Sequence, residues 1–137
     1  MTLTRRHLLL AAPALAPAAR AQTAWPDRPL RIIVPFAAGG GQDITARILA
    51  EPLRAAFGQP VVVENRPGAS GMIGAHYVVQ APPDGTTLLL AGAGETAINQ
   101  HLYKDKMAYD PLRDLRPASL VGKVPVVVMA WPEAPFR

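Results

Sequence analysis

The sequence of 137 residues contains no cysteine, and aromatic residues make up only 6% of it. Without cysteine the chain has no disulfide, no thiolate metal site and no thiol nucleophile.

The excess of basic over acidic residues is also confined to one part of the sequence. Residues 1–21 hold three of the 14 basic residues and no acidic one, which leaves 11 basic against 10 acidic residues in the rest. A nearly neutral body of mixed charge argues against a nucleic-acid partner.

Residues 1–21 have the layout of a secretory signal. A basic start is followed by an apolar run from Leu8 to Ala19 and by the small-residue site Ala19-Arg20-Ala21. The run is too short to span a bilayer. We expect export with cleavage after Ala21. The general secretory route and the twin-arginine route both stay open, because "TRRHLL" also fits the twin-arginine pattern.

Apolar runs and helical patterns alternate along residues 22–137. Runs of strand length lie at Leu30–Phe36, Val61–Glu64, 86–94 and Val124–Trp131. Helical spacing follows the first two runs, at about Gln42–Phe57 and 71–81, and the polar stretch 97–123 predicts short helices and loops. Alternation of this kind predicts an α/β fold with a parallel sheet, right-handed crossovers and flanking helices.

The first predicted helix carries one apolar stripe opposite a charged face, and the stripe consists of Ile44, Ile48, Leu49, Leu53, Ala56 and Phe57. Pro52 should kink or shorten this helix, and Gly58 is a natural stop at its end. Ser70 precedes the second predicted helix, where a serine is typical of an N-cap.

Glycine-containing loops follow the first three predicted strands, at Ala37–Asp43, Arg66–Gly71 and Gly92–Thr96. Such loops lie at one edge of a parallel sheet, so we expect them to converge on one crevice. Helix N-termini expose unpaired N–H groups that carry partial positive charge, and glycine lets a ligand approach them closely. The three loops together predict a site for a small anion held by backbone amides. Taken singly, each loop is equally compatible with turn geometry alone.

Two acidic residues lie in these loops. Asp43 falls in the first turn of a helix, where an acid stabilises the helix dipole, and a role as a general base is the alternative. Glu95 would repel an anion unless it binds an amino or hydroxyl group of the ligand. A Glu95 side chain that points to solvent is the other interpretation.

Other chemistries fit these residues less well. The dinucleotide fingerprint lacks its third glycine and no Gly-Lys-Ser/Thr is present, which argues against nucleotides. His76 and His101 have no histidine or carboxylate at metal-ligand spacing. Ser70 in "GASGMIG" does not match the Gly-x-Ser-x-Gly elbow, so a secreted α/β hydrolase using Ser70 is only the alternative. We expect no catalytic residue, no metal and no cofactor.

Several stretches carry a family resemblance: "WPDRPLRIIVPFAAGGGQDITARILAEPL", "GQPVVVENRPGASGMIGAHYVV", "PPDGTTLLL" and "INQHLYKDKMAYDPLRDLRPASLVGKVPVVV". In this order they resemble the N-terminal half of the substrate-binding proteins of tripartite tricarboxylate transporters, also called Bug receptors. The resemblance runs from about Trp25 to the last residue. It implies a periplasmic two-lobed receptor of the type II clamshell kind, in which residues 22–137 form the N-terminal lobe and end near the crossover strand.

The resemblance also implies what is bound. Such receptors capture a small di- or tricarboxylate or an amino acid, largely through backbone amides and ordered water, and deliver it to membrane transporter subunits. Carried onto this chain, the ligand-binding positions are Ala38, Gly39, Gly40, Gly41, Asp43, Ala69, Ser70, Gly71, Gly94, Glu95 and Thr96.

The chain departs from the family pattern at two positions and in its length. Family members often carry a hydroxyl residue at Gln42 and near Glu95, which affects ligand identity. The length implies either a fragment or a truncated, non-functional receptor. A monomer is expected, and a sensor lobe that docks on a membrane kinase is an open alternative to transport.

Overall fold

The structure is a computed structural model that describes residues 25–125 and 127–131. The expected secretory signal, residues 1–21, and its cleavage after Ala21 lie outside these residues. Within the described part of the chain, no helix is long and apolar enough to cross a membrane.

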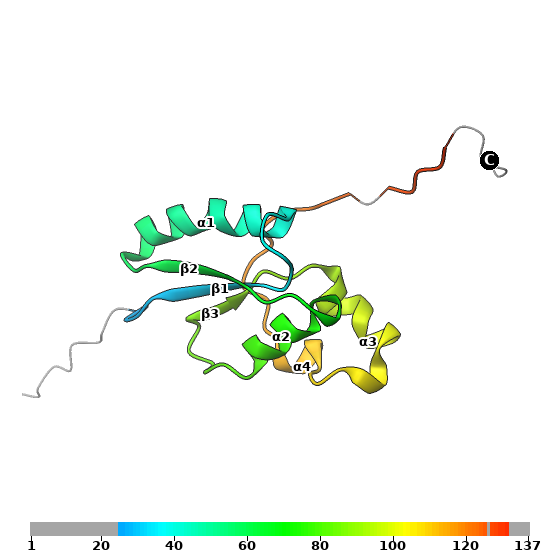
Figure 1. The fold of residues 1–137 in the computed structure, drawn as a ribbon. Helices are drawn as coiled ribbons and strands as arrows, with labels where there is room; N and C mark the ends of the chain where they lie inside the picture. The colour runs from blue at the N-terminus through cyan, green and yellow to red at the C-terminus, as the bar shows by residue number, and fades with distance from the viewer. Residues whose placement is uncertain (1–24, 126, 132–137) are drawn as a thin grey trace, which may run out of the picture.

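The centre of the fold is a parallel three-stranded sheet (Figure 1). Its strands are β1 (Leu30–Val34), β2 (Val61–Asn65) and β3 (Thr87–Leu89), in the order β2-β1-β3. Ile32 on β1 lies opposite Val63 on β2 and Leu88 on β3. The prediction of a parallel α/β sheet with flanking helices is confirmed.

Helices cover both faces of the sheet. Helix α1 (Gly41–Phe57) lies on one face and the shorter α2 (Met72–Val79) on the other (Figure 1). Side chains alternate between the faces of a strand, so Ile32 and Val34 share one face and pack there against Ala46 of α1. This cluster is the core beneath α1.

The apolar stripe predicted for α1 is only partly buried. Ala46 is fully buried and Leu53 packs against the same cluster, whereas Ile44 and Ile48 are 53% and 68% exposed. Each residue turns a helix by about 100°, so positions two before and two after Ala46 point away from the sheet. The two isoleucines therefore belong to the outer face of the helix.

Pro52 does not shorten α1, which was one of the two predicted effects. The helix continues to Phe57, and Pro52 lies on its exposed side. The Ile48 carbonyl, which the proline leaves without a helical donor, can be solvated on that side. The predicted stop is confirmed, because Gly58 has a left-handed φ of 65° and its N–H donates to the Arg54 carbonyl at 3.0 Å.

The start of α2 differs from the prediction. A single 3-10 turn, η3 (Ala69–Gly71), precedes the helix, and four consecutive residues have positive φ, from Gly68 to Gly71. An N-cap residue normally has extended backbone, but Ser70 has φ 53° and ψ 37°. The cap position is Gly71, which makes no side-chain cap hydrogen bond. The prediction that Ser70 caps this helix is wrong.

Short helical turns follow β3, as predicted for the polar stretch. They are the π-helical turn η4 (Gly94–Ile98), α3 (Asn99–Leu102), the 3-10 turn η5 (Lys104–Lys106) and α4 (Pro111–Asp114). Asp110 caps α4, since its Oδ1 accepts from the Leu112 N–H at 2.9 Å.

The fourth predicted strand is not formed in the described residues of Val124–Trp131. Beyond α4 the described chain contains neither helix nor strand, and Val128 is 98% exposed. Figure 1 shows this segment running away from the body of the fold. An extended segment becomes a strand only when another strand pairs with its backbone, and the three-stranded sheet does not include this one.

Candidate ligand-binding site

The loops that follow the three strands meet at the carboxyl-terminal edge of the sheet, as predicted. Two asparagine side chains join them. Asn65 Nδ2 donates to the Phe36 carbonyl at 3.1 Å, and the buried Asn99 Nδ2 donates to the Ser70 carbonyl at 2.9 Å. Neither asparagine was predicted. Asn65 lies at the end of a strand, and Asn99 lies four residues after Glu95. These two positions are the sequence signals that could have indicated a role for them.

The first loop leads into an open helix N-terminus. Gly40 occupies the cap position of α1 with extended backbone and no side-chain cap hydrogen bond. A Cβ added at Gly39 or Gly41 would meet no heavy atom within 4 Å, and Ala38 is exposed beside them. The first N–H groups of α1 therefore carry the partial positive charge of the helix at a surface that a ligand can approach.

Asp43 organises this loop from beneath. Its side chain is only 3% exposed. Oδ2 accepts from the Gly39 N–H at 2.9 Å and from Arg47 Nε at 3.0 Å, and Oδ1 accepts from Asn65 Nδ2 at 3.0 Å. The hydrogen bond from Arg47, followed by that from Gly39, lowers the pKa of Asp43 to about 2. Both carboxylate oxygens of Asp43 thus accept hydrogen bonds from protein groups, so the side chain fixes the position of the first loop.

The second loop presents Ala69 and Ser70 at the surface. The Ser70 hydroxyl lies 3.3 Å from the Tyr103 hydroxyl. Gly71 is buried, and its surroundings differ from those of the glycines in the first loop. A Cβ at Gly71 would overlap the Glu95 side chain, lying 2.8 Å from its Cδ. Glycine is needed at this position because a protein carboxylate fills the space.

Glu95 in the third loop is buried, with 1% of its surface exposed, so the expectation that it points to solvent is wrong. Its Oε2 accepts from the Gly92 N–H at 2.8 Å, while Oε1 is buried and has no hydrogen-bond partner among the described residues. The Tyr109 hydroxyl donates to the Glu95 backbone carbonyl at 2.9 Å. Burial raises the pKa of Tyr109, and the Glu95 charge adds to this effect.

The remaining predicted residues of the third loop lie at its surface. Gly94 is half-buried, and a Cβ added there would meet no heavy atom within 4 Å. Thr96 is exposed, and its hydroxyl donates to the Gly92 carbonyl at 2.8 Å. The Gln42 amide, from the first turn of α1, lies beside Gly92 and connects the first loop to the third.

Two other chemistries find little support here. In the part of the chain that the structure describes, no three histidine, aspartate or glutamate side chains gather as a metal site. The Ser70 hydroxyl lies against the Tyr103 hydroxyl and not against a histidine, so the nucleophile-base pair of a serine hydrolase is not formed among the described residues.

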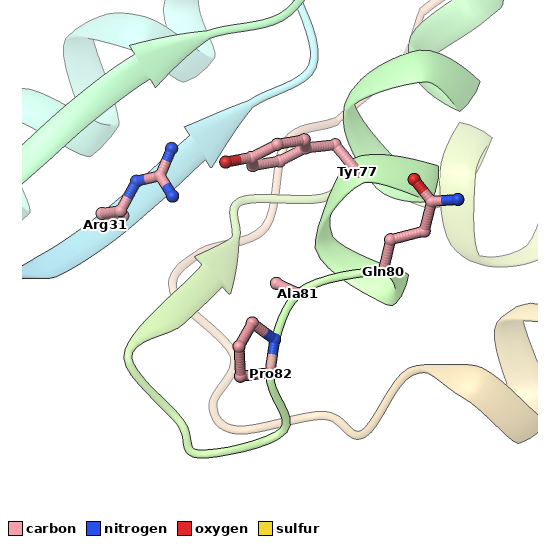
Figure 2. A pocket seen from close by; sticks show the side chains of 5 residues that line it. All are labelled: Arg31, Tyr77, Gln80, Ala81 and Pro82. Atoms are coloured by element: carbon pink, nitrogen blue, oxygen red, sulfur yellow. The ribbon is translucent and has the colours of Figure 1, made fainter.

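Two hollows lie elsewhere on the surface. The first, of about 230 Å³, is lined by Arg31, Tyr77, Gln80, Ala81 and Pro82 (Figure 2). Figure 2 shows Arg31 on β1 pointing toward the hydroxyl end of Tyr77. Arg31 also forms a two-pronged ion pair with Glu64, at 2.6 and 2.8 Å. The second hollow, of about 330 Å³, is lined by Gln100, Lys104, Met107 and Tyr109–Leu112. Neither includes a predicted ligand-binding residue.

Comparison with known proteins places the chain among bacterial receptors. The family model described as "Tripartite tricarboxylate transporter family receptor" matches residues 45–137. The chain is 46% identical over 126 residues to a UPF0065 protein of Bordetella bronchiseptica, covering 90% of this chain and 37% of that protein. It is 42% identical over 109 residues to Protein BugT of Bordetella pertussis, covering 80% of this chain and 33% of that protein. The chain thus spans about a third of the length of these relatives.

Solved structures are similar as well. One titled "Structure of a periplasmic transporter" matches with a TM-score of 0.63 and 43% identity, over 66% of this chain and 30% of the other. MatC from Rhodopseudomonas palustris, solved with bound malate, matches with a TM-score of 0.62 and 38% identity, over 66% of this chain and 30% of the MatC chain. The α/β sheet described above is therefore similar to part of a receptor fold.

Proposed function

This chain belongs to the tripartite tricarboxylate transporter receptor family, and on that premise we propose that it captures a small carboxylate in the periplasm for a membrane transporter. The family consists of receptors rather than enzymes, which overturns the hydrolase alternative that used Ser70. The related MatC structure holds malate, which favours a carboxylate ligand. Another related structure is that of a periplasmic transporter, which favours that compartment.

The observation that carries the proposal is the open start of α1. Unpaired N–H groups at an uncapped helix N-terminus attract a carboxylate, and the space above Gly41 leaves its backbone accessible. The Asn65 side chain ties the end of β2 to the first loop, and the Gln42 amide of α1 lies beside Gly92 of the third loop. We therefore expect a ligand held there to reach Ser70 and Thr96 as well. Capture by amides needs neither a metal nor a cofactor.

The predicted site residues divide into two groups in this proposal. Those with exposed or open backbone contact the ligand: Ala38, Gly39, Gly40, Gly41, Ala69, Ser70, Gly94 and Thr96. Asp43 and Gly71 give the loops their shape, Asp43 by holding Gly39 and Gly71 by leaving room for Glu95. Glu95 is buried and accepts a hydrogen bond from the Gly92 N–H, so it also shapes its loop.

We further propose that residues 22–137 act as one lobe of a two-lobed receptor. The three loops form a single wall at the edge of the sheet, and a bound ligand is enclosed only when a second wall covers it. The short share of its relatives that this chain spans is consistent with a second lobe elsewhere in the receptor.

Isothermal titration calorimetry on the native full-length protein tests this function. The panel contains succinate, malate, citrate and glutamate, and we expect at least one to bind with measurable heat. In the variant Gly41→Leu the added side chain enters open space, so the fold is retained while the approach to the amides is blocked. We expect affinity to fall at least about tenfold with little change in melting temperature.

Gly122→Leu is the matched control, because a Cβ there also meets no heavy atom within 4 Å and the residue is exposed and is not one of the predicted ligand-binding positions. It should bind as the wild type does. Absence of binding to the whole panel would reject carboxylate capture, and equal affinity of Gly41→Leu and wild type would reject this location for it.

A further inference from the structure

The second loop has a strained backbone. The Gly71 N–H donates to the Gly68 carbonyl at 3.0 Å, and the two residues between them have left-handed φ, 47° at Ala69 and 53° at Ser70. A turn with positive φ at both central residues is normally built from glycine, asparagine or aspartate. Alanine and serine adopt this backbone at a cost, so it persists only where the surrounding structure holds it.

The helical segment after the third loop holds Ser70 at two atoms. Asn99, the first residue of α3, is only 3% exposed, and its Nδ2 donates to the Ser70 carbonyl at 2.9 Å. Tyr103 follows one helical turn later, and its hydroxyl lies 3.3 Å from the Ser70 hydroxyl. One turn of this segment therefore engages both the backbone and the side chain of the strained serine.

The same segment also contacts the next residue of the loop. Glu95 lies four residues before Asn99, in the π-helical turn η4, and its side chain fills the space against Gly71. Residues four apart share one side of a helical segment, so two buried polar side chains reach Ser70 and Gly71 together. A π-helical turn is itself rare and occurs often at functional sites.

We propose that Asn99 is a positioning residue for ligand capture, because its hydrogen bond keeps Ser70 in the left-handed conformation in which the second loop meets the ligand. This inference rests on the proposed function, in which Ala69 and Ser70 contact the carboxylate. Asn99 is buried and acts through Ser70. A ligand binds only those molecules whose loop has the competent conformation, so losing the hydrogen bond lowers the apparent affinity by the fraction of molecules that leave it.

This role separates ligand binding from folding stability. Removing a buried amide that only supports the fold should lower the melting temperature. Removing Asn99 also lets Ala69 and Ser70 leave a strained backbone, and the relief of strain offsets the lost hydrogen bond. Both residues are exposed, so the loop can relax without opening the core. We therefore expect a large change in affinity and a small change in melting temperature.

Calorimetry on the native full-length protein tests the proposal, with whichever of succinate, malate, citrate and glutamate binds the wild type most tightly. Asn99→Leu keeps roughly the size of the side chain and removes the donor. We expect its affinity to fall at least about tenfold, with little change in melting temperature.

Gln100→Met is the matched control, because it removes a side-chain amide from the next residue of α3. That amide lies against His101, and the hollow that Gln100 lines includes no predicted ligand-binding residue. The control should bind within about twofold of the wild type.

A Ser70→Gly background makes the test specific for backbone conformation. Glycine adopts a left-handed backbone as readily as a right-handed one, so the loop depends less on Asn99 there. The fold-loss in affinity caused by Asn99→Leu should shrink at least about threefold in this background. If Asn99→Leu does not fold, as judged by circular dichroism, Asn99→Ser takes its place, since its shorter side chain withdraws the donor from the Ser70 carbonyl.

The outcomes are separable from those of the proposed function. Three results would overturn this inference and keep carboxylate capture: wild-type affinity in the Asn99 variant, an equal loss of affinity in both backgrounds, or failure of both Asn99 variants to fold. Absence of binding of the whole panel to the wild type would overturn the proposed function and this inference with it.

Discussion

Helix α2 approaches the sheet closely through Gly74, and adding one methyl group there should separate them. A Cβ on Gly74 would lie 2.9 Å from Pro35 Cα, 2.9 Å from Pro35 Cβ and 3.0 Å from the Arg66 carbonyl oxygen. Pro35 follows β1 and Arg66 follows β2, so both contacts belong to the edge of the sheet where the loops begin. Two of the three atoms are backbone and cannot rotate away.

The expected cost of Gly74→Ala follows from two opposing terms. Alanine is favoured over glycine inside a helix by about 1 kcal/mol. Overpacking of a buried site costs about 1–3 kcal/mol, and a site bounded by backbone belongs at the upper end of that range. We therefore expect a net loss of about 1–2 kcal/mol of unfolding free energy. Because α2 carries the second loop, ligand affinity should fall as well.

Urea unfolding of the native full-length protein, followed by circular dichroism, measures this change. The control is Gly41→Ala, where the new methyl group meets open space and the helix-propensity gain is not offset. A Gly74→Ala protein as stable as Gly41→Ala, or more stable than the wild type, would refute the close packing of α2 against the ends of β1 and β2.

Two further predictions concern the loops. The pKa of Asp43 is lowered from 3.8 to about 2, so the stability it contributes should be fully present above about pH 4 and lost as pH falls through about 2. Urea unfolding of wild type and Asp43→Asn across this range should show a weaker pH dependence in the variant, and parallel curves would contradict the anchoring role. Ala69 has a left-handed φ of 47°. Ala69→Val should therefore cost about 1–2 kcal/mol of unfolding free energy while Ala69→Gly costs little, and equal melting curves would contradict the left-handed turn.

The sheet could be predicted because the information for it is local. Runs such as Leu30–Val34 and Val61–Asn65, each followed by a glycine turn and a helical pattern, admit few arrangements other than parallel strands. The convergence of the loops followed from the same rule. The sequence could not indicate which side of α1 packs, since Ile44 and Ile48 look as apolar as Ala46 and only the position of the sheet distinguishes them.

Ser70 and Val124–Trp131 were predicted wrongly because distant partners decide their conformation. A serine before a helix is a good N-cap signal, yet the Ser70 carbonyl accepts from Asn99 on α3 and its backbone is left-handed. The apolar run from Val124 has the composition of a strand, but a strand requires a neighbour and the described sheet gives it none.

The sequence alone cannot distinguish glycines that leave space for a ligand from glycines that are packed within the protein. Gly39 and Gly41 face open space, whereas Gly71 and Gly74 face the Glu95 side chain and the Pro35 backbone. Gly39, Gly41 and Gly71 stand in the same kind of strand-to-helix segment and Gly74 lies just inside α2, so the atoms that separate open from closed glycines come from elsewhere in the chain. A larger side chain at an open glycine should weaken ligand binding before it weakens folding, and at a closed glycine the order should reverse. Whether binding or folding stability is lost first therefore distinguishes a glycine that exposes its backbone to a ligand from one that allows close packing within the protein.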